Sequence, residues 1–261
     1  LTLARSGLPM IDADEVREAV AHWGTTSDQI HKDHLISHLL NALRDVGGFV
    51  FYGGTALNRT FLSDRLSEDI DLYLNPREPA VPDDVIPLLI ARTNREFPDL
   101  RVDTATREGD VRTYSVTTES HRIQIQFVGP RPEHGTIEVY RNHVELTYSD
   151  LPESVPLVTP TLVAFYALKA AAFEDRHLER DLFDLAGLAR IGAIDSDALD
   201  ALRTFRGTGP TPWMYQDDRA PDPRAWEVAL AHQTRAPGDP RQAIASVREV
   251  LAAAGAWKED S

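Results

Sequence analysis

The spacing of hydrophobic residues divides the chain into a helical start, a mixed middle and a helical end. Apolar side chains recur at helical intervals within 12–22 and 26–43, which predicts two amphipathic helices. Helical spacing returns at 160–193 and again after a loop rich in proline and glycine. The remaining expected elements are strands at 48–52, 69–74, 100–106, 111–118, 121–128 and 136–145, helices at 82–96, from 226 and at 240–257, and a loop at 207–224.

These sections predict the domain organisation. We expect an α/β (α+β) section with N-terminal helices at 1–150 and a helical section at 151–261 that completes the functional site. With 261 residues the chain is long enough for one large or two small cores. No internal repeat interrupts this plan.

The first chemical signal is a glycine turn. An apolar run at 48–52 leads into Gly53, Gly54 and Thr55, and a helical pattern comes next. Where a strand passes through glycines into a helix, unpaired backbone amides and the helix dipole attract an anion such as phosphate. Thr55 suits a helix cap or a phosphate hydrogen bond. A Gly-Gly-Thr turn alone also occurs as a simple connection, so its meaning depends on the residues after it.

A pair of carboxylates comes shortly after the glycine turn. Residues 69–74 alternate polar and apolar side chains, so Asp69 and Asp71 should share one face of a strand while Ile70 and Leu72 point into the core. Two close carboxylates repel each other unless a cation lies between them, and Mg²⁺ prefers a few carboxylates completed by phosphate and water oxygens. A solvent-facing strand could carry the same pattern. The adjacent glycine turn favours a Mg²⁺ site at Asp69 and Asp71.

Composition limits the function classes. The net charge of −14 opposes binding of a nucleic-acid backbone, although arginines gather in several places and could form a local basic face. Pairing of those arginines with nearby acids is the plainer alternative. There is no cysteine, no basic-then-apolar leader and no run near the ~20 apolar residues of a membrane span. We therefore expect a soluble, cytoplasmic protein without membrane contact.

Five blocks in a defined order identify a family resemblance. They are a Lys-Asp helix at 29–36, Gly-Gly-Thr-Ala-Leu at 53–57, Arg-Leu-Ser-Glu-Asp-Ile-Asp-Leu at 65–72, Lys169, and Arg-Asp-Leu-Phe-Asp-Leu at 180–185. Together they resemble the nucleotidyltransferase toxins of the AbiEii/AbiGii group, which includes the MenT toxins. That group is part of the DNA polymerase β-like nucleotidyltransferase superfamily. The resemblance implies a polymerase β-like core with a mixed sheet, followed by a helical C-terminal section.

The resemblance also implies roles for single residues. Lys169 is one of only three lysines beside 24 arginines, and it lies in an apolar run, where it would hold triphosphate oxygens. A lysine extending from a helix edge is the alternative. Because Lys169 is far from the glycine turn, a Walker-type loop is excluded. The implied phosphate-binding set is Gly53, Gly54, Thr55, Arg65, Ser67 and Lys169, and the implied catalytic set is Asp69, Asp71, Lys169, Asp181 and Asp184.

One position departs from the superfamily pattern. Polymerase β-like enzymes commonly carry a third carboxylate on a later strand, but the outward positions of the strand at 121–128 are Gln124 and Gln126. Glutamine is neither an anionic ligand nor a useful base. Asp181 or Asp184 could substitute, with an Arg-Asp ion-pair ladder as the structural alternative. Otherwise catalysis would rely on positioning and metal electrostatics, or the enzyme would be weakened.

The expected activity comes from the resemblance. A toxin of this kind would transfer a nucleotide from a nucleoside triphosphate to an acceptor hydroxyl, with Mg²⁺ bridging the phosphates. The MenT toxins suggest the 3′ end of tRNA as acceptor, which would block aminoacylation and growth, and AbiEii relatives imply a cognate antitoxin, AbiEi-like or other. Two rival classes stay open: a nucleotidyltransferase that modifies a protein or small molecule, and a non-catalytic descendant that binds nucleotide or a partner.

Ser67 adds a regulatory hypothesis. It precedes Asp69 by two residues and would share its strand face if the strand began early enough. A phosphate there would repel the triphosphate and compete for Mg²⁺. We therefore expect Ser67→Glu to be inactive and Ser67→Ala to remain active.

Overall fold

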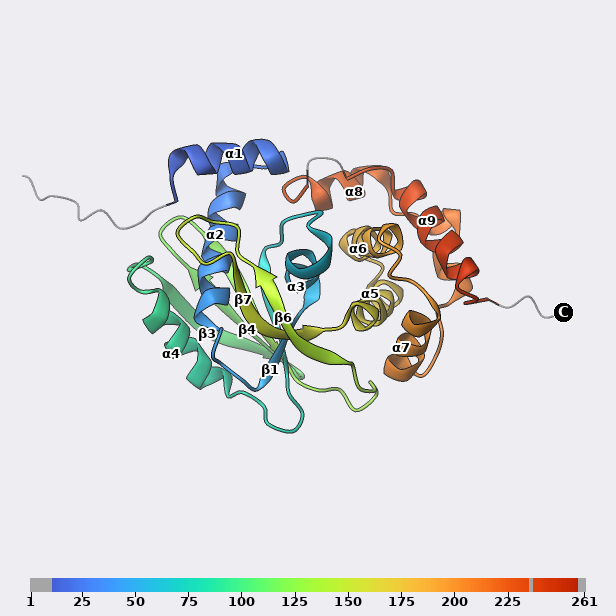
Figure 1. Cartoon of the computed structure of the whole chain (residues 1–261), viewed down its shortest axis with the longest axis horizontal. Coiled ribbons are helices and arrows are strands. Elements are labelled where there is room, and N and C mark those ends of the chain that lie inside the picture. The colour runs from blue at the N-terminus through green and yellow to red at the C-terminus, as the bar shows by residue number, and fades with distance from the viewer. Residues whose placement is uncertain (1–10, 235–236, 258–261) are drawn as a thin grey trace, which may run out of the picture.

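The fold is a mixed five-stranded sheet with helices on both sides (Figure 1), in a computed structural model that describes residues 11–234 and 237–257. From one edge to the other, its strands are β1 (Phe49–Tyr52), β2 (Asp69–Leu74), β5 (Arg122–Val128), β4 (Val111–Thr117) and β3 (Arg101–Glu108). β2 and β5 run parallel, and the other neighbours pair antiparallel. The predicted α/β class with a mixed sheet is confirmed.

The N-terminal half of the chain contributes five helical segments among the described residues. They are α1 (Ala13–Trp23), α2 (Ser27–Ala42), α3 (Gly53–Leu57), a π-helical turn η1 (Asn58–Leu62) and α4 (Pro82–Thr93). The Asp12 carboxylate accepts the Asp14 amide and begins α1, as the capping pattern predicts. The Thr26 hydroxyl accepts the Gln29 amide and begins α2 in the same way. α2 is the more buried of the two and packs near α4.

A second, two-stranded sheet was only half predicted. Strand β6 (Val139–Glu145) matches an expected strand, but its antiparallel partner β7 (Ser154–Pro160) was not expected. β7 contains Pro156 and Pro160, which favour turns in a sequence, and it tolerates them because it pairs with β6 alone within the described residues. Strands β6 and β7 lie on either side of residue 150 and pair with each other. One continuous hydrophobic core contains residues from both halves of the chain. The division at 150 stays a prediction.

The C-terminal section is helical. Its helices are α5 (Leu162–Arg176), α6 (Glu179–Arg190), α7 (Ser196–Arg206), α8 (Pro223–Leu230) and α9 (Pro240–Ala253), with 3₁₀ turns at Pro212–Tyr215 and Asp217–Arg219. His177, with φ 54°, ends α5 in a left-handed conformation, so the segment at 160–193 forms two helices rather than one. Figure 1 places α1, α2 and α4 on the left and α5 to α9 on the right, with α3 between them. Over the described ranges, no helix is both long and apolar enough to cross a membrane.

Candidate functional site

The glycine turn lies at the junction of β1 and α3 and touches the acidic strand. Gly53 has φ +80°, and a Cβ at this position would collide with the Asp71 carboxylate. Glycine is therefore required both by the backbone conformation and by the close approach of β2. The Thr55 hydroxyl donates to the backbone carbonyl of Asp69, so it ties the turn to β2 and does not cap α3. α3 has no side-chain cap, which leaves its first amides without that partner.

Asp69 and Asp71 lie on one face of β2, as the alternation predicts. Ile70 and Leu72 between and after them are fully buried on the other face. Neither carboxylate has an ion-pair partner among the described residues. Burial, followed by repulsion from Asp69, raises the pKa of Asp71 to about 6, and burial also raises the pKa of Asp69 although Arg180 opposes the shift. Lys169, Arg176 and Arg180 act on the pair only from beyond ion-pair distance, so its negative charge is only partly offset by the protein.

Two glutamines stand beside this pair. In the parallel register, Gln124 lies opposite Asp69 and Gln126 lies opposite Asp71. Their amides approach each other, with Gln126 Nε2 at 3.4 Å from Gln124 Oε1. The third carboxylate that polymerase β-like enzymes commonly carry on this strand is therefore replaced by neutral amides next to the aspartates.

A second pair of carboxylates, on α6, is tightly neutralised. Lys169 on α5 places Nζ 3.2 Å from Asp181 Oδ1 and 2.7 Å from Asp184 Oδ2. Arg176 donates Nε to Asp181 Oδ2 at 2.7 Å. Burial opposes ionisation of Asp181, but Lys169 and Arg176 overcome it and hold its pKa below the usual value. The turn at His177 brings α6 back against α5 and produces this contact.

Asp184 is the centre of a buried network. It is fully buried and accepts two hydrogen bonds from Arg65, at 2.9 Å each, and one from Asn58 at 3.3 Å. Arg65 also donates to Gln233 Oε1 and to the Leu66 carbonyl. Burial raises the Asp184 pKa, but the nearby cations, Arg65 first, lower it to about 2 overall. Arg65 thus pairs with Asp184 in a buried position, and its expected phosphate contact stays a prediction.

The expectation that Asp181 or Asp184 substitutes for the missing strand carboxylate stays a prediction, but their environment bears on it. A replacement for the missing strand carboxylate should be free to bind metal or accept a proton. Asp181 and Asp184 are instead held as anions by Lys169, Arg176 and Arg65, and their lowered pKa values make them poor bases. The Arg-Asp ion-pair alternative describes their environment better, and Lys169 extends it.

A cavity of about 640 Å³ opens in front of the glycine turn and Asp71. This volume falls within the usual range for a small-molecule site. The aromatic and basic residues that line this cavity were not predicted from the sequence. The available signals were that Tyr52 directly precedes the glycines and that Arg131 belongs to an arginine-rich stretch. The lining includes Gly53, Gly54, Asp71, Gln126, Lys169 and Arg176, with Tyr52, Tyr73, Arg131, Phe165 and Phe205 as walls.

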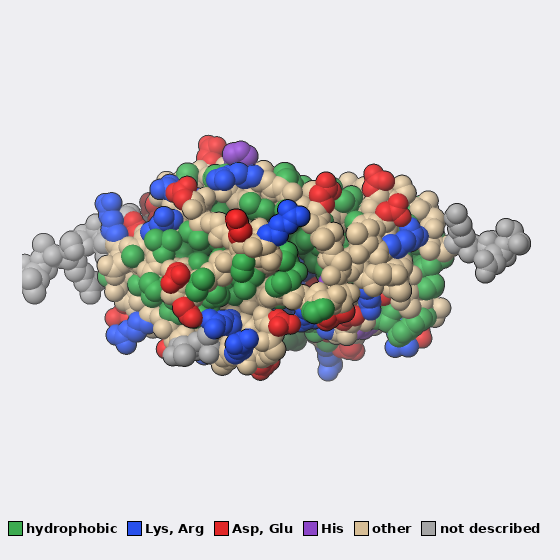
Figure 2. Space-filling view, turned by 90° about the horizontal axis from the view of Figure 1, so that it is seen from below, with side chains coloured by type: hydrophobic (Ala, Val, Ile, Leu, Met, Phe, Trp, Pro, Cys, Tyr) green, Lys and Arg blue, Asp and Glu red, His purple; other side chains and the backbone are tan. Residues whose placement is uncertain are grey.

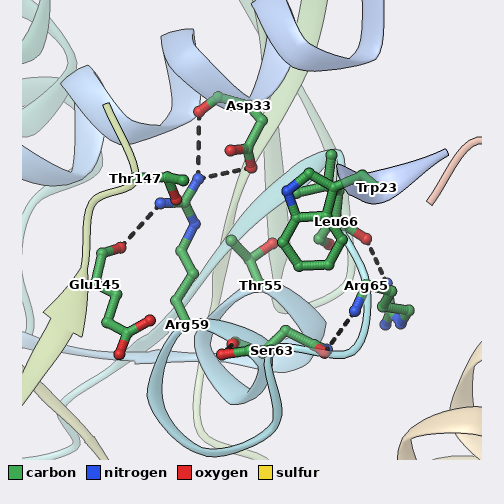
Figure 3. A pocket seen from close by; sticks show the side chains of 11 residues that line it. Trp23, Asp33, Thr55, Arg59, Ser63, Arg65, Leu66, Glu145 and Thr147 are labelled. Atoms are coloured by element: carbon green, nitrogen blue, oxygen red, sulfur yellow. Dashed lines mark hydrogen bonds and ion pairs between the residues drawn. The ribbon is translucent and has the colours of Figure 1, made fainter. Parts of the chain in front are cut away.

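Ser67 lies elsewhere. β2 begins at Asp69, so Ser67 precedes the strand and the shared strand face is not formed. It lines a separate small cavity of about 40 Å³, together with Thr55 and Arg65. Arg59 also lines this cavity, and it donates hydrogen bonds to Asp33 and to the Glu145 carbonyl (Figure 3). The effect of a phosphate on Ser67 stays a prediction.

The surface carries both signs of charge. On the face seen in Figure 2, Lys and Arg side chains are interspersed with Asp and Glu, and hydrophobic patches lie between them. Several arginines pair with nearby acids, including Arg112 with Asp83 at 2.9 Å and Arg206 with Asp175 at 2.7 Å. This agrees with the plainer interpretation of those arginines as solvated partners of acids.

Comparison with known proteins places this geometry in a family. A family model described as nucleotidyl transferase AbiEii toxin, type IV toxin–antitoxin system, matches residues 35–253. No curated protein sequence shows a significant match. Among solved structures, the chain is similar to the nucleotidyltransferase toxin MenT4 from Mycobacterium tuberculosis H37Rv, with 20% identity, a TM-score of 0.62, and coverage of 96% of this chain and 92% of that one.

Two Helicobacter pylori structures share the fold. JHP933 has 16% identity and a TM-score of 0.57, with 88% of this chain and 92% of that chain covered. A putative nucleotidyltransferase has 17% identity and a TM-score of 0.53, with 87% and 95% covered. The family match spans most of the sequence, including the glycine turn, the acidic strand and the Lys169 network. The chain therefore belongs to the AbiEii family of nucleotidyltransferase toxins from toxin–antitoxin systems.

Proposed function

We propose that this protein transfers a nucleoside monophosphate from a nucleoside triphosphate to an acceptor hydroxyl, in a Mg²⁺-dependent reaction. The observation that carries the proposal is the pair Asp69 and Asp71, which lacks a cationic partner among the described residues and adjoins the glycine turn; Asp71 itself lines the 640 Å³ cavity. A site with two carboxylates that lack ion-pair partners, beside backbone amides that can donate hydrogen bonds to phosphate, is suited to a metal–triphosphate complex.

The residues fit a hard divalent cation. Asp69 and Asp71 would supply two oxygen ligands from one strand face. The raised pKa of Asp71 comes from burial first and from repulsion by Asp69 second, and a bound cation would offset both. Gln124 and Gln126 beside them are neutral, so the site would take fewer anionic ligands than a three-carboxylate centre. Mg²⁺ held there would neutralise charge on the reacting phosphates.

The chain's other groups would bind and orient the triphosphate. Gly53 and Gly54 line the cavity at the start of a helix that has no side-chain cap. Lys169 and Arg176 line the same cavity while they pair with the α6 carboxylates. In the reaction, the acceptor hydroxyl oxygen would bond to the α-phosphorus as its proton passes to solvent, while the bond from that phosphorus to the α–β bridging oxygen breaks and pyrophosphate leaves. With no free third carboxylate at the glutamine positions, in-line positioning and electrostatic stabilisation would supply most of the acceleration.

The acceptor is proposed by family analogy. MenT4 is a nucleotidyltransferase toxin, and transfer to the 3′ end of tRNA would explain growth arrest through loss of aminoacylation. A cognate antitoxin would be the natural partner in a type IV toxin–antitoxin system. The acidic net charge of −14 keeps a protein or small-molecule acceptor as the rival, with electrostatic repulsion of RNA as its physical basis.

Labelled substrates distinguish these possibilities. The purified protein is incubated with Mg²⁺ and each α-labelled triphosphate, with total tRNA or with protein lysate. We expect label in tRNA, lost on addition of a chelator and in Asp69→Ala. Label in protein would indicate the rival function, a nucleotidyltransferase that modifies a protein. Absence of label from every acceptor, with nucleotide binding retained, would identify a non-catalytic descendant. Full transfer by Asp69→Ala would refute the assignment of the site.

A further inference from the structure

Two histidines and an aspartate gather at a point that the proposed nucleotide site does not use. His34 and His38 are four residues apart on α2, so their side chains lie on the same face of the helix. Asp150 comes from the connection between β6 and β7. The histidines are only 4% and 7% exposed, whereas the Asp150 side chain is 16% exposed. None of the three lines the large cavity.

Their ligand atoms have the spacing of a metal site. His34 Nε2 and His38 Nε2 each lie 3.0 Å from Asp150 Oδ2, and the two nitrogens are 3.2 Å apart. In a tetrahedral zinc site with bonds of about 2.0–2.1 Å, neighbouring ligand atoms are about 3.3 Å apart. The three atoms therefore already outline one face of such a tetrahedron.

Hydrogen bonding alone satisfies this arrangement poorly. The Nε2 atom of a neutral imidazole either donates or accepts. If both Nε2 atoms carry hydrogens and donate to Asp150, two N–H donors lie only 3.2 Å apart and repel each other. If His34 donates to His38 instead, the accepting His38 Nε2 lies 3.0 Å from Asp150 Oδ2 with no hydrogen between the two atoms. A divalent cation would accept lone pairs from all three groups at once.

The donor set selects the class of metal. Two imidazole nitrogens with one carboxylate suit Zn²⁺ and similar first-row ions, whereas Mg²⁺ and Ca²⁺ prefer oxygen ligands alone. Aromatic rings line the cluster: the His38 and Phe97 centroids are 5.2 Å apart, and those of His34 and Tyr148 are 4.9 Å apart. Such a shell limits access of water to the site.

The cluster connects elements that support the glycine turn. Asp33, next to His34, binds Arg59 NH2 at 2.7 Å, and Arg59 NH1 donates to the Glu145 carbonyl at the end of β6 (Figure 3). Arg59 belongs to η1, which directly follows α3. We propose that His34, His38 and Asp150 bind one Zn²⁺ or similar transition-metal ion, which clamps α2 to the β6–β7 connection.

The test is metal binding by the full chain after treatment with a chelator. Zn²⁺ is titrated calorimetrically in excess Mg²⁺, which occupies any oxygen-only site. We expect one equivalent to bind and, at a concentration 100-fold above Kd, a rise in melting temperature of about 5–10 °C. His38→Gln and Asp150→Asn should each weaken binding at least ~10-fold. His121→Gln is the matched control, because His121 contacts Asp28 of α2 at 3.3 Å outside the cluster.

The alternative outcomes are equally clear. Absence of Zn²⁺ binding, or binding that His38→Gln and Asp150→Asn leave unchanged, would overturn the proposal. Loss of binding in Asp69→Ala instead would assign the ion to the acidic strand. If either cluster variant fails to fold, Co²⁺ replaces Zn²⁺ in the parent protein: an intense tetrahedral ligand-field spectrum supports the site, and a weak octahedral spectrum refutes it.

Discussion

The two pairs of aspartates in this molecule share a residue type but have opposite environments. Asp69 and Asp71 on β2 have raised pKa values, and no ion-pair partner for them lies in the described ranges. Asp181 and Asp184 on α6 are held by Lys169, Arg176 and Arg65, and their pKa values are lowered. A carboxylate left uncompensated can take up a cation, whereas a carboxylate already neutralised stabilises the fold and positions its partners.

This difference indicates how the site is built. The α6 aspartates hold Lys169 with its ammonium at the cavity, and the buried Arg65 links α6 to the segment before β2. Breaking the first pair should therefore change activity, and breaking the second should change stability.

The largest expected effect is on the activity of Asp69→Ala. Loss of one ligand from the acidic pair removes electrostatic stabilisation of the transferring phosphate, so the rate of nucleotide transfer should fall on the order of 10²- to 10³-fold. Initial rates with saturating triphosphate and Mg²⁺ measure it. The melting temperature should stay within a few degrees of the parent, because the removed charge has no ion-pair partner among the described residues. A rate of nucleotide transfer equal to that of the parent would contradict the proposed role of Asp69 in activity.

Asp184→Asn should mainly lower stability. The change leaves the buried Arg65 and Lys169 without their full countercharge, a loss of about 3–5 kcal/mol in the free energy of unfolding. Urea denaturation followed by circular dichroism measures it. Asp175→Asn is the matched control, because Asp175 is exposed and its pair with Arg206 should contribute at most about 1 kcal/mol. Equal losses in both variants would contradict the buried network.

Acid should weaken the same network. The folded-state pKa of Asp184, about 2, is below its ordinary value of 3.8, so its contribution is complete above the unfolded pKa and is lost as pH falls towards 2. The shift corresponds to about 2 kcal/mol. Unfolding free energies of the parent and Asp184→Asn, measured between pH 5 and pH 2, should converge as acid is added. Parallel curves would argue against a contribution of ionised Asp184 to the free energy of unfolding.

The smallest expected effect belongs to Gln126→Glu. A third carboxylate opposite Asp71 adds repulsion, which should cost about 1 kcal/mol of stability without metal and be regained with Mg²⁺. The measurement is the rise in melting temperature on adding Mg²⁺, which should be larger in the variant than in the parent. Gln242→Glu, at an exposed position of α9, controls for the added charge. An equal Mg²⁺ effect in all three proteins would place residue 126 away from the cation.

Local sequence predicted much of the site. The alternation around Asp69 and Asp71 and the glycines at 53–54 depend on neighbours along the chain, and the structure has them as a strand face and a turn. The roles of Arg65 and Asp184 were not predictable in this way. Their hydrogen bonds join residues 119 positions apart, and no spacing rule indicates which cation a carboxylate will meet.

The fold shows the same division. Caps and periodicity located the helices of the first section, but β7 was missed because its prolines resemble a turn until β6 pairs with it. The family resemblance implies a turn near His177, and the structure makes it with a left-handed residue that is not glycine. The contact of Asp150 with His34 joins positions 116 residues apart.

The sequence by itself determined the chemical groups of the site: a glycine turn, two aspartates on one strand face, and a lysine in an apolar helix. These groups arise from local periodicity and backbone preference, which a short segment carries with it. Only the tertiary structure decided which carboxylates are neutralised by ion pairs and which have no such partner among the described residues. The physical reason is that a charge is compensated by whatever packs against it, and packing is settled when distant segments share one core.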